Sequence, residues 1–211
     1  MRDAYLAAAD TAVRQIRDDA VAEAWGRASA LPEMSVGALA CHLAGQVFAA
    51  RDLLQQVPAP DADAAIPLLE HYRRAAWVEA DLDDEVMVEI RSGAEQKAED
   101  GHAALVARLE EAFAELPGIL ADQPADRAVL IPWQGWSLSL DDFLVTRMME
   151  ITVHSDDLAA SLDREPPELP ESVLGPVLAL LVGVSLRRHG QSAVVRALSR
   201  AERAPASITA F

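Results

Sequence analysis

The chain has 211 residues, 51% of them hydrophobic, which suits one domain with a proper core or one domain plus a small extension. It carries 34 acidic residues against 18 lysines and arginines, a formal net charge of −16. This charge argues against binding that depends on neutralised phosphates or anionic lipid headgroups. The single cysteine, Cys41, excludes an intrachain disulfide framework. We therefore expect no nucleic-acid partner and no membrane partner.

The start of the chain interleaves charges with apolar positions and lacks the pattern of a secretory signal. The longest apolar stretch, 173–186, contains glycine and proline and is too short to cross a bilayer comfortably. These features predict a cytoplasmic protein.

Two amphipathic helices are predicted in the first third of the chain. Apolar residues recur at steps of three and four from Leu6 to Ala24, which places them on one face of a first helix. After Pro32, Ser35 can cap a second helix. The inward face of this second helix reads Leu39, His42, Leu43, Gln46, Ala50 and Leu53. His42 is therefore expected on the side that faces the core.

A proline-rich connection and a shorter helix follow. Pro58, Pro60 and Pro67 frame a predicted turn. The stretch 68–80 is predicted to be helical and to end in the acidic run 81–85, which we expect to be a solvated loop.

The next stretch, 85–92, alternates only weakly and has no partner for a strand, so we expect it to be irregular. A third long helix is predicted from about Glu95 to Leu116, and Pro117 and Gly118 are expected to end it.

The segment 131–136 cannot be regular helix at Pro132 and Gly135, and we interpret it as a loop that carries Trp133 and Trp136. These two tryptophans are candidates for the wall of a cofactor-binding pocket, and aromatic packing beneath the loop is the alternative.

A fourth helix begins at Ser139, which forms an approximate capping box with Asp142, and runs to about Leu162. Prolines 166, 167 and 170 interrupt the chain. A fifth helix, 171–188, and a short amphipathic piece, 193–203, complete the prediction. The fold class is thus all-α, a four-helix bundle with additional C-terminal helices. We expect 1–165 to form the bundle and 166–211 to form a helical extension packed on it.

Four ionisable residues share one stripe of the predicted fourth helix. They are spaced three, four and three apart: Arg147, Glu150, His154 and Asp157. Charged groups beside a core must be paired or must bind a metal, because burying them alone costs several kcal/mol. Glu150 and His154 lie one helical turn apart and can reach a single ion, so a third ligand is needed from elsewhere.

His42 is the best-placed third ligand because it lies on the inward face of the second helix. Three protein ligands with an open position are typical of a catalytic zinc site. The spacing by itself also fits a solvated Glu150–His154 pair or a core histidine. The sequence pattern alone leaves these readings open.

The stretches Leu31–Gly45 (LPEMSVGALACHLAG) and Arg147–Leu158 (RMMEITVHSDDL) resemble two motifs of the mycothiol-dependent maleylpyruvate isomerase-like family, within the DinB-like superfamily. In that family the first motif holds one metal histidine, and the second holds a glutamate and a histidine. The resemblance spans about residues 1–163. It implies a DinB-like bundle in which His42, Glu150 and His154 bind a divalent metal, with zinc as the expected ion.

The resemblance also implies a cofactor and a reaction. The cofactor is mycothiol or a similar small thiol, which a metal ion can convert to the nucleophilic thiolate for addition to a small electrophile. The founding isomerase has a C-terminal α/β domain that contributes to its active site, whereas about forty residues follow Pro170 here. The implied activity is therefore isomerase-like or S-transferase, and isomerisation itself is not implied.

Arg147 and Asp157 match the family's second motif and are candidate catalytic residues. Arg147 can orient Glu150 or contact an acidic ligand, and Asp157 can hold the second imidazole nitrogen of a ligand histidine. An ordinary helical ion pair is the alternative for both.

The remaining histidines and the cysteine have simpler interpretations. Cys41 is expected to be a small buried residue, because it points about 100° away from His42 on the helix. We interpret His102 as a surface or capping residue, with an extra ligand or proton donor as the alternative. His71 and His189 lie beside arginines and are predicted to face solvent.

Three functions remain open from the sequence. The first is a metal-dependent enzyme whose partners are a thiol cofactor and a small-molecule substrate. The second is a non-catalytic metal-binding bundle with a ligand-sensing or structural role. The third is a plain helical interaction domain. A homodimer is compatible with each.

Overall fold

The computed structural model describes residues 1–56, 65–121 and 123–211. Helices dominate this part of the chain, and its one sheet is a two-stranded hairpin. The predicted all-α class is therefore confirmed. The helices are α1 (Arg2–Ile16), α2 (Asp19–Ala24), α3 (Val36–Leu54), α4 (Leu68–Arg74), η2 (Ala76–Glu79), α5 (Glu85–Ala98), α6 (His102–Leu120), α7 (Leu140–Ser161), α8 (Glu171–His189), α9 (Gln191–Ser199) and η3 (Ala201–Arg203).

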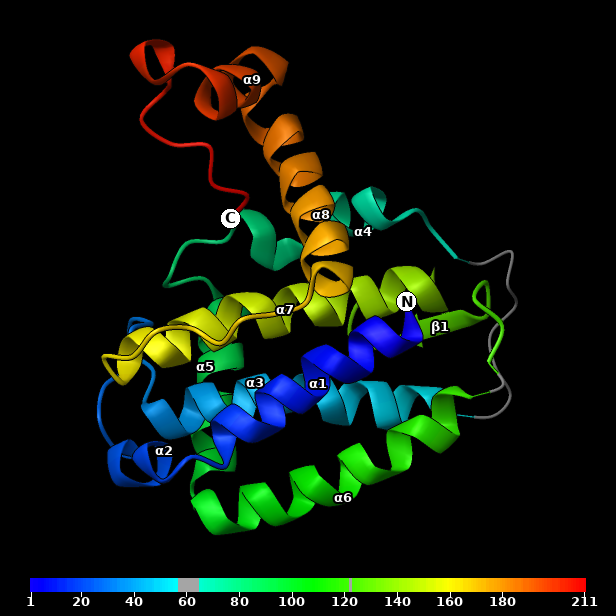
Figure 1. Ribbon diagram of the computed structural model, residues 1–211, viewed down its shortest axis with the longest axis vertical. Helices are drawn as coiled ribbons and strands as arrows, with labels where there is room; N and C mark the ends of the chain where they lie inside the picture. The colour runs from blue at the N-terminus through cyan, green and yellow to red at the C-terminus, as the bar shows by residue number, and fades with distance from the viewer. Residues whose placement is uncertain (57–64, 122) are drawn as a thin grey trace.

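Four long helices, α1, α3, α6 and α7, form the central bundle (Figure 1). Both α1 and α3 pack against α6 on one side and against α7 on the other. Their shared core includes the fully buried side chains of Tyr5, Leu39, Leu43, Leu109 and Phe143. α5 packs on α3, and α8 packs on α7, α1 and α4. The bundle therefore holds α3 and α7 side by side, which is the pairing that the site requires.

Hydroxyl caps fix the starts of these two helices, as the sequence predicts. Ser35 accepts a hydrogen bond from Ala38 N at the start of α3, and Ser139 accepts one from Asp142 N at the start of α7. Glu95 of α5 reinforces the first cap, because its carboxylate accepts hydrogen bonds from Ser35 N at 2.6 Å and Ser35 Oγ at 2.9 Å. These hydrogen bonds fix the residue at which each of the two helices begins.

The single N-terminal helix predicted to reach Ala24 is wrong, because the chain breaks after Ile16. Asp18 has an extended backbone, and its side chain accepts a hydrogen bond from Ala20 N, which starts α2 as a separate helix. A capping residue in the middle of a helical apolar pattern can therefore start a new helix, although the pattern itself continues.

The region 85–116 also differs from the prediction. The stretch expected to be irregular forms most of α5, and α6 begins only at His102. Gly101 separates the two helices with a φ of +84°, a conformation that favours glycine. Pro117 does not end α6, because Leu116 and Leu120 lie one turn apart and are both buried, which holds the last turn in place.

The helix predicted over 68–80 is shorter than expected. α4 ends at Arg74, Ala75 is extended, and η2 follows as a separate turn. Pro67 precedes α4 directly, whereas Pro58 and Pro60 lie outside the described residues.

The loop predicted over 131–136 is the turn of a β-hairpin, whose two strands the prediction did not include. β1 (Ala128–Ile131) pairs antiparallel with β2 (Trp136–Ser139), and the chain turns between Ile131 and Trp136. Val129 and Leu138 are partners in this pairing and are both buried. The hairpin leads directly into the start of α7.

Helices also form after the bundle, as predicted: α8 matches the expected helix 171–188, and α9 with η3 occupies the expected amphipathic piece. The domain boundary at 165/166 stays a prediction. No helix among residues 1–56, 65–121 and 123–211 has both the length and the apolar character needed to cross a bilayer.

Candidate metal centre

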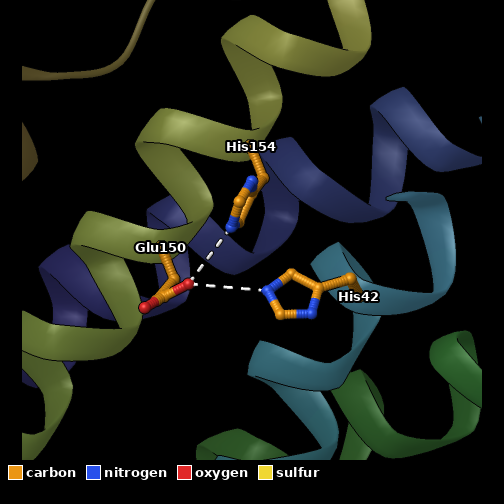
Figure 2. A group of neighbouring side chains, drawn as sticks. All are labelled: His42, Glu150 and His154. Atoms are coloured by element: carbon orange, nitrogen blue, oxygen red, sulfur yellow. Dashed lines mark ion pairs between the residues drawn. The ribbon is translucent and has the colours of Figure 1, made fainter. Parts of the chain in front are cut away.

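Three side chains converge between α3 and α7 (Figure 2). Oε2 of Glu150 lies 3.2 Å from Nε2 of His154 and 3.6 Å from Nε2 of His42. The two imidazole rings meet edge to face with their centroids 4.6 Å apart. One donor atom from each of the three residues lies within 4.8 Å of the other two. The structure therefore brings together the three residues predicted as metal ligands.

The helices determine how each of these side chains is presented. Glu150 and His154 are one turn apart on α7, and Met148, Ile151 and Leu158 anchor that helix in the core. Both therefore face α3. The side chain of His42 keeps 25% of its surface exposed, so the group is reachable from solvent at the α3 side.

The electrostatics favour a negative carboxylate surrounded by positive charge. Burial alone raises the pKa of Glu150, but hydrogen bonds to His154 and His42 and the charge of Arg147 outweigh it, so the pKa lies well below its usual range. Burial lowers the pKa of His154, and the carboxylates of Asp157 and Glu150 raise it to about 9. A buried carboxylate of this kind needs a compensating cation, which a proton or a metal ion can supply.

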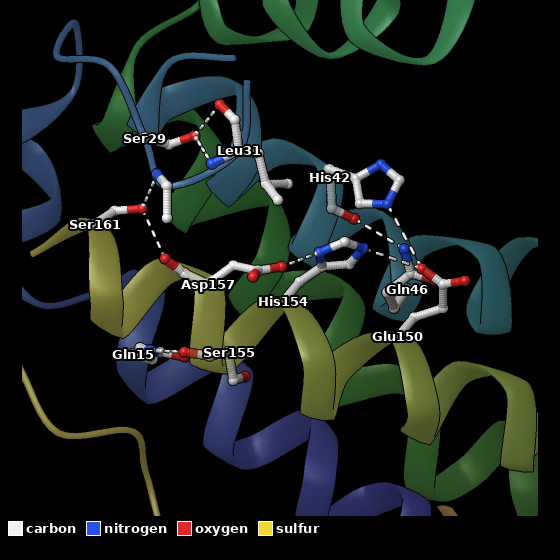
Figure 3. A network of polar contacts seen from close by, with 11 residues as sticks. Gln15, Ser29, Leu31, His42, Gln46, Glu150, His154, Ser155, Asp157 and Ser161 are labelled. Carbon is white, nitrogen blue, oxygen red and sulfur yellow. Dashed lines mark hydrogen bonds and ion pairs between the residues drawn. The ribbon is translucent and has the colours of Figure 1, made fainter. Parts of the chain in front are cut away.

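Asp157 orients His154 from the other side of the ring. Nδ1 of His154 donates a hydrogen bond to Asp157 Oδ2 at 2.9 Å, which turns Nε2 toward Glu150 (Figure 3). Ser161 Oγ donates to the backbone carbonyl of Asp157 and accepts from Ala30 N. This network ties the stripe on α7 to the loop before α3. Ser161 was not singled out from the sequence.

Arg147 is linked to the turn of α3 that carries His42 by two hydrogen bonds through Gln46. Its NH1 donates to Gln46 Oε1 at 2.5 Å, and Gln46 Nε2 donates to the backbone carbonyl of His42 at 3.0 Å. Within the described part of the chain Arg147 forms no ion pair with a carboxylate, so the helical ion pair considered above is not observed for it. Gln46 therefore connects Arg147 to the helical turn that carries His42. Helical periodicity places Gln46 on the inward face of α3, but it does not predict this connection.

His71 is buried, and the prediction that it faces solvent is wrong. Its Nδ1 accepts a hydrogen bond from Trp136 Nε1 at 3.0 Å, and its ring packs edge to face on Tyr72. Burial, together with the charge of Arg147, lowers the pKa of His71 to about 4, while Glu150 opposes that shift. The imidazole is therefore neutral at pH 7.

The two predicted pocket tryptophans have different surroundings. Trp136 is half-buried on His71, whereas Trp133 is exposed at the turn of the hairpin. A cofactor-binding role for either stays a prediction.

The remaining histidines and Cys41 lie apart from this network. His102 contacts the carbonyl of Ile16 at 2.7 Å, and His189 contacts the carbonyl of Thr209 at 2.8 Å. Cys41 is buried, as predicted, and burial raises the pKa of its thiol to about 11. Its thiolate is therefore scarce at neutral pH.

A family model described as the mycothiol maleylpyruvate isomerase N-terminal domain matches residues 6–159. The chain belongs to this family. The match confirms the resemblance seen in the two sequence motifs and agrees with a DinB-like helical fold. No curated protein and no solved structure matches the chain.

The matched residues include His42, Glu150 and His154, and α8 and α9 follow the matched range. The donor set fits a divalent metal. Two imidazole nitrogens and one carboxylate oxygen are typical zinc ligands, which bind at about 2.0–2.2 Å. Separations of 3.2 and 3.6 Å between donor atoms are compatible with one shared ion.

Proposed function

We propose that this chain is a metal-dependent enzyme of the mycothiol-dependent isomerase or S-transferase type. It would activate a low-molecular-weight thiol at a zinc ion for addition to a small electrophile. The observation that carries the proposal is the convergence of His42, Glu150 and His154 within 4.8 Å, at a place where α7 buries a carboxylate between two imidazoles. The family's name, which contains mycothiol and maleylpyruvate isomerase, supports the choice of thiol and reaction class.

The residues of the chain have distinct tasks in this proposal. His42, Glu150 and His154 would hold the ion. Asp157 would keep the proton of His154 on Nδ1, so that the lone pair of Nε2 faces the ion. Arg147 would position His42 through Gln46. Zinc supplies positive charge that stabilises a thiolate at neutral pH.

The nucleophile would come from the cofactor rather than from the protein. The only cysteine, Cys41, is buried and burial raises the pKa of its thiol, so it is a poor source of thiolate. In the addition, the S–H bond of the small thiol breaks, its sulfur forms a bond to the electrophilic carbon, and its proton ends on the adduct. This step is common to transfer and to thiol-assisted isomerisation. The partial exposure of His42 supports access for both reactants.

The alternative is a non-catalytic metal-binding bundle with a ligand-sensing or structural role. The observation that favours it is the low exposure of Glu150 and His154, whose side chains keep 15% and 17% of their surface. A structural ion would be enclosed in the same way.

Metal analysis combined with thiol-conjugation assays tests the proposal. We expect purified wild type to contain about one zinc ion per chain and to conjugate mycothiol to at least one of a panel of small electrophiles. His42→Ala should lose both the metal and the turnover. His189→Ala is the matched control, because His189 lies at the end of α8 and its ring hydrogen-bonds to the carbonyl of Thr209 rather than to any of the three candidate ligands.

The outcomes separate the two functions. Bound metal without turnover across the panel would favour the non-catalytic bundle. Wild type without metal, or His42→Ala with unchanged metal content, would overturn the metal site itself.

A further inference from the structure

The segment between α7 and α8 folds back along α7. Asp163 has a left-handed backbone with a φ of +55°, and the N–H of Arg164 donates a hydrogen bond at 3.0 Å to a carbonyl in the last turn of α7, which reverses the chain. Residues 164–170 then run beside α7 to the start of α8 (Figure 1). We call residues 164–170 the strap. Three prolines fix φ within the strap and donate no backbone hydrogen bond, so the strap stays extended.

A cleft with a volume of about 640 Å³ lies between the strap, α7 and the start of α8. Volumes of about 300–1,000 Å³ are typical of sites that bind small organic molecules. The strap contributes residues 166–169 to the lining, and α7 contributes residues between 152 and 157. Positions 152, 153, 156 and 157 share one face of that helix, because they follow the helical spacing. The cleft is therefore a groove along α7 that the strap closes on one side.

Carboxylates surround the mouth of this cleft. Asp156 on α7 and Glu168 on the strap are exposed, and neither forms an ion pair within the part of the chain that the structure describes. Asp157 uses Oδ2 in the hydrogen bond described above, whereas its Oδ1 has no partner among the same residues. None of the described residues that line the cleft is a lysine, arginine or histidine, and the strap's Arg164 pairs with Asp18 at 2.6 Å. The mouth therefore favours a cation.

The floor of the cleft holds a hydroxyl without a partner. Ser155 lines the cleft and is only 1% exposed, and its Oγ forms no hydrogen bond with any described residue. The side chain points away from the imidazoles of His42 and His154 (Figure 3). Buried polar groups are normally hydrogen-bonded, so an unpaired hydroxyl at the floor indicates a missing partner. A ligand with a polar group at its inner end would supply that partner.

The walls between the mouth and the floor are apolar. Val153, the strap's Pro167 and Leu169, and Leu174 of α8 contribute to them. A calcium ion needs about six to eight oxygen ligands and would leave these walls uncovered. A carbon skeleton would remove the same surface from water, which is favourable. The cleft thus combines a negative mouth, apolar walls and a hydrogen-bonding floor.

We propose that this cleft binds small hydroxylated organic amines, such as arylalkylamines with a hydroxyl at the far end. The protonated amine binds the carboxylates at the mouth, the apolar body packs between α7 and the strap, and the ligand's hydroxyl pairs with Ser155. The site is separate from the candidate metal centre, although Asp157 borders both. Binding requires neither a metal ion nor a thiol, so the proposal goes beyond the proposed function and does not depend on it.

Tyramine is a probe that has all three features, and two related compounds each lack one. Phenethylamine lacks the hydroxyl, and 3-(4-hydroxyphenyl)propanoate carries a carboxylate in place of the amine. NMR titration of the ¹⁵N-labelled full-length protein in EDTA at about pH 7.5 measures each Kd and locates the bound probe. Tyramine should shift the amide signals of 152–157 and 168–169. It should bind about threefold to tenfold more tightly than phenethylamine, and about tenfold or more tightly than the propanoate.

Substitutions test the mouth and the floor separately. Asp156→Asn with Glu168→Gln should raise the Kd for tyramine about fivefold to tenfold. Because the whole chain carries a net charge of −16, the matched control is Asp83→Asn with Glu89→Gln, which removes the same charge from exposed positions around the start of α5. Ser155→Ala should give tyramine and phenethylamine equal Kd values. It should not lower the midpoint of thermal unfolding, because its Oγ has no hydrogen bond to lose.

Several results would overturn the proposal. Tyramine could fail to bind at about 10 mM, could shift signals across the acidic surface instead of the cleft, or could bind no more tightly than the propanoate. Equal losses of affinity in the two double variants would indicate attraction to the net charge instead of a site. A persistent preference for tyramine over phenethylamine in Ser155→Ala would contradict the role of the floor hydroxyl.

Discussion

Replacing Asp157 by asparagine is the sharpest test of how this side chain prepares the candidate metal centre. The change keeps the size of the side chain and removes the negative charge that accepts the hydrogen bond from His154 Nδ1 at 2.9 Å. A hydrogen bond to a charged group contributes about 1.5–3 kcal/mol. The Asp157 side chain keeps 23% of its surface exposed, so solvent screening favours the lower part of that range, about 1.5–2 kcal/mol.

That free energy predicts a measurable loss of metal affinity. Because about 1.4 kcal/mol corresponds to a factor of ten, the Kd for zinc should rise by about tenfold to thirtyfold. Competition against a chromogenic chelator at pH 7.5 measures this Kd. In the metal-free protein, NMR titration should also show a lower pKa for His154, because one of the two carboxylates that raise it is gone.

Asp156→Asn is the matched control. Asp156 is the exposed neighbour of Asp157 on the same helix, so this substitution removes the same charge without changing the hydrogen bond to His154. Equal losses of zinc affinity in the two variants would indicate a general charge effect and would contradict a specific role for the Asp157–His154 hydrogen bond. Wild-type affinity in Asp157→Asn would contradict that role too.

Three further predictions concern the scaffold around the site. His71→Gln keeps an acceptor for Trp136 but removes a group with a depressed pKa, about 4 instead of 6.5. Between these pH values the His71 imidazole binds a proton in the unfolded chain but not in the folded chain. The contribution of His71 to the free energy of unfolding is therefore complete above pH 6.5. It is lost as the pH falls to 4, and the loss is about 3 kcal/mol at most. Urea unfolding in the presence of a chelator measures the free energy of unfolding of wild type and His71→Gln. The difference between the two values should change between pH 6.5 and pH 4, and a constant difference would contradict this prediction. Gly37→Ala should destabilise by about 1–3 kcal/mol, because its Cβ would lie 2.6 Å from the Trp25 ring, whereas Gly45→Ala on the same helix has open space and should stabilise by up to about 1 kcal/mol in thermal unfolding. Cys41 should react with iodoacetamide far more slowly in native protein than in urea, and equal rates would contradict its burial.

The sequence alone determined the features that depend on local chemistry. Ser35 and Ser139 were identified as caps because a hydroxyl at the first position of a helix satisfies free N–H groups whatever lies nearby. Helical periodicity placed Glu150 and His154 on one stripe, and it placed His42 on an inward face. The family resemblance then assigned these residues of two helices to one metal site. The caps and the faces need only local residue types and helical spacing, whereas joining His42 to Glu150 and His154 needed the family resemblance.

Tertiary structure alone decided features that rest on distant partners. His71 is buried because Trp136, 65 residues later, donates to its ring, and no local pattern carries that contact. β1 and β2 are each four residues long and form only because they pair with each other. α6 continues past Pro117 because the core holds Leu116 and Leu120.

The candidate site shows the same division. The sequence determined which side chains α7 presents together, because one helical turn sets that spacing. Only the packing of α3 on α7 decided that His42 Nε2 lies 3.6 Å from Glu150 and that Arg147 reaches Gln46 instead of a carboxylate. Positions of side chains from two helices depend on the depth and rotation at which the helices pack, and the whole core sets these.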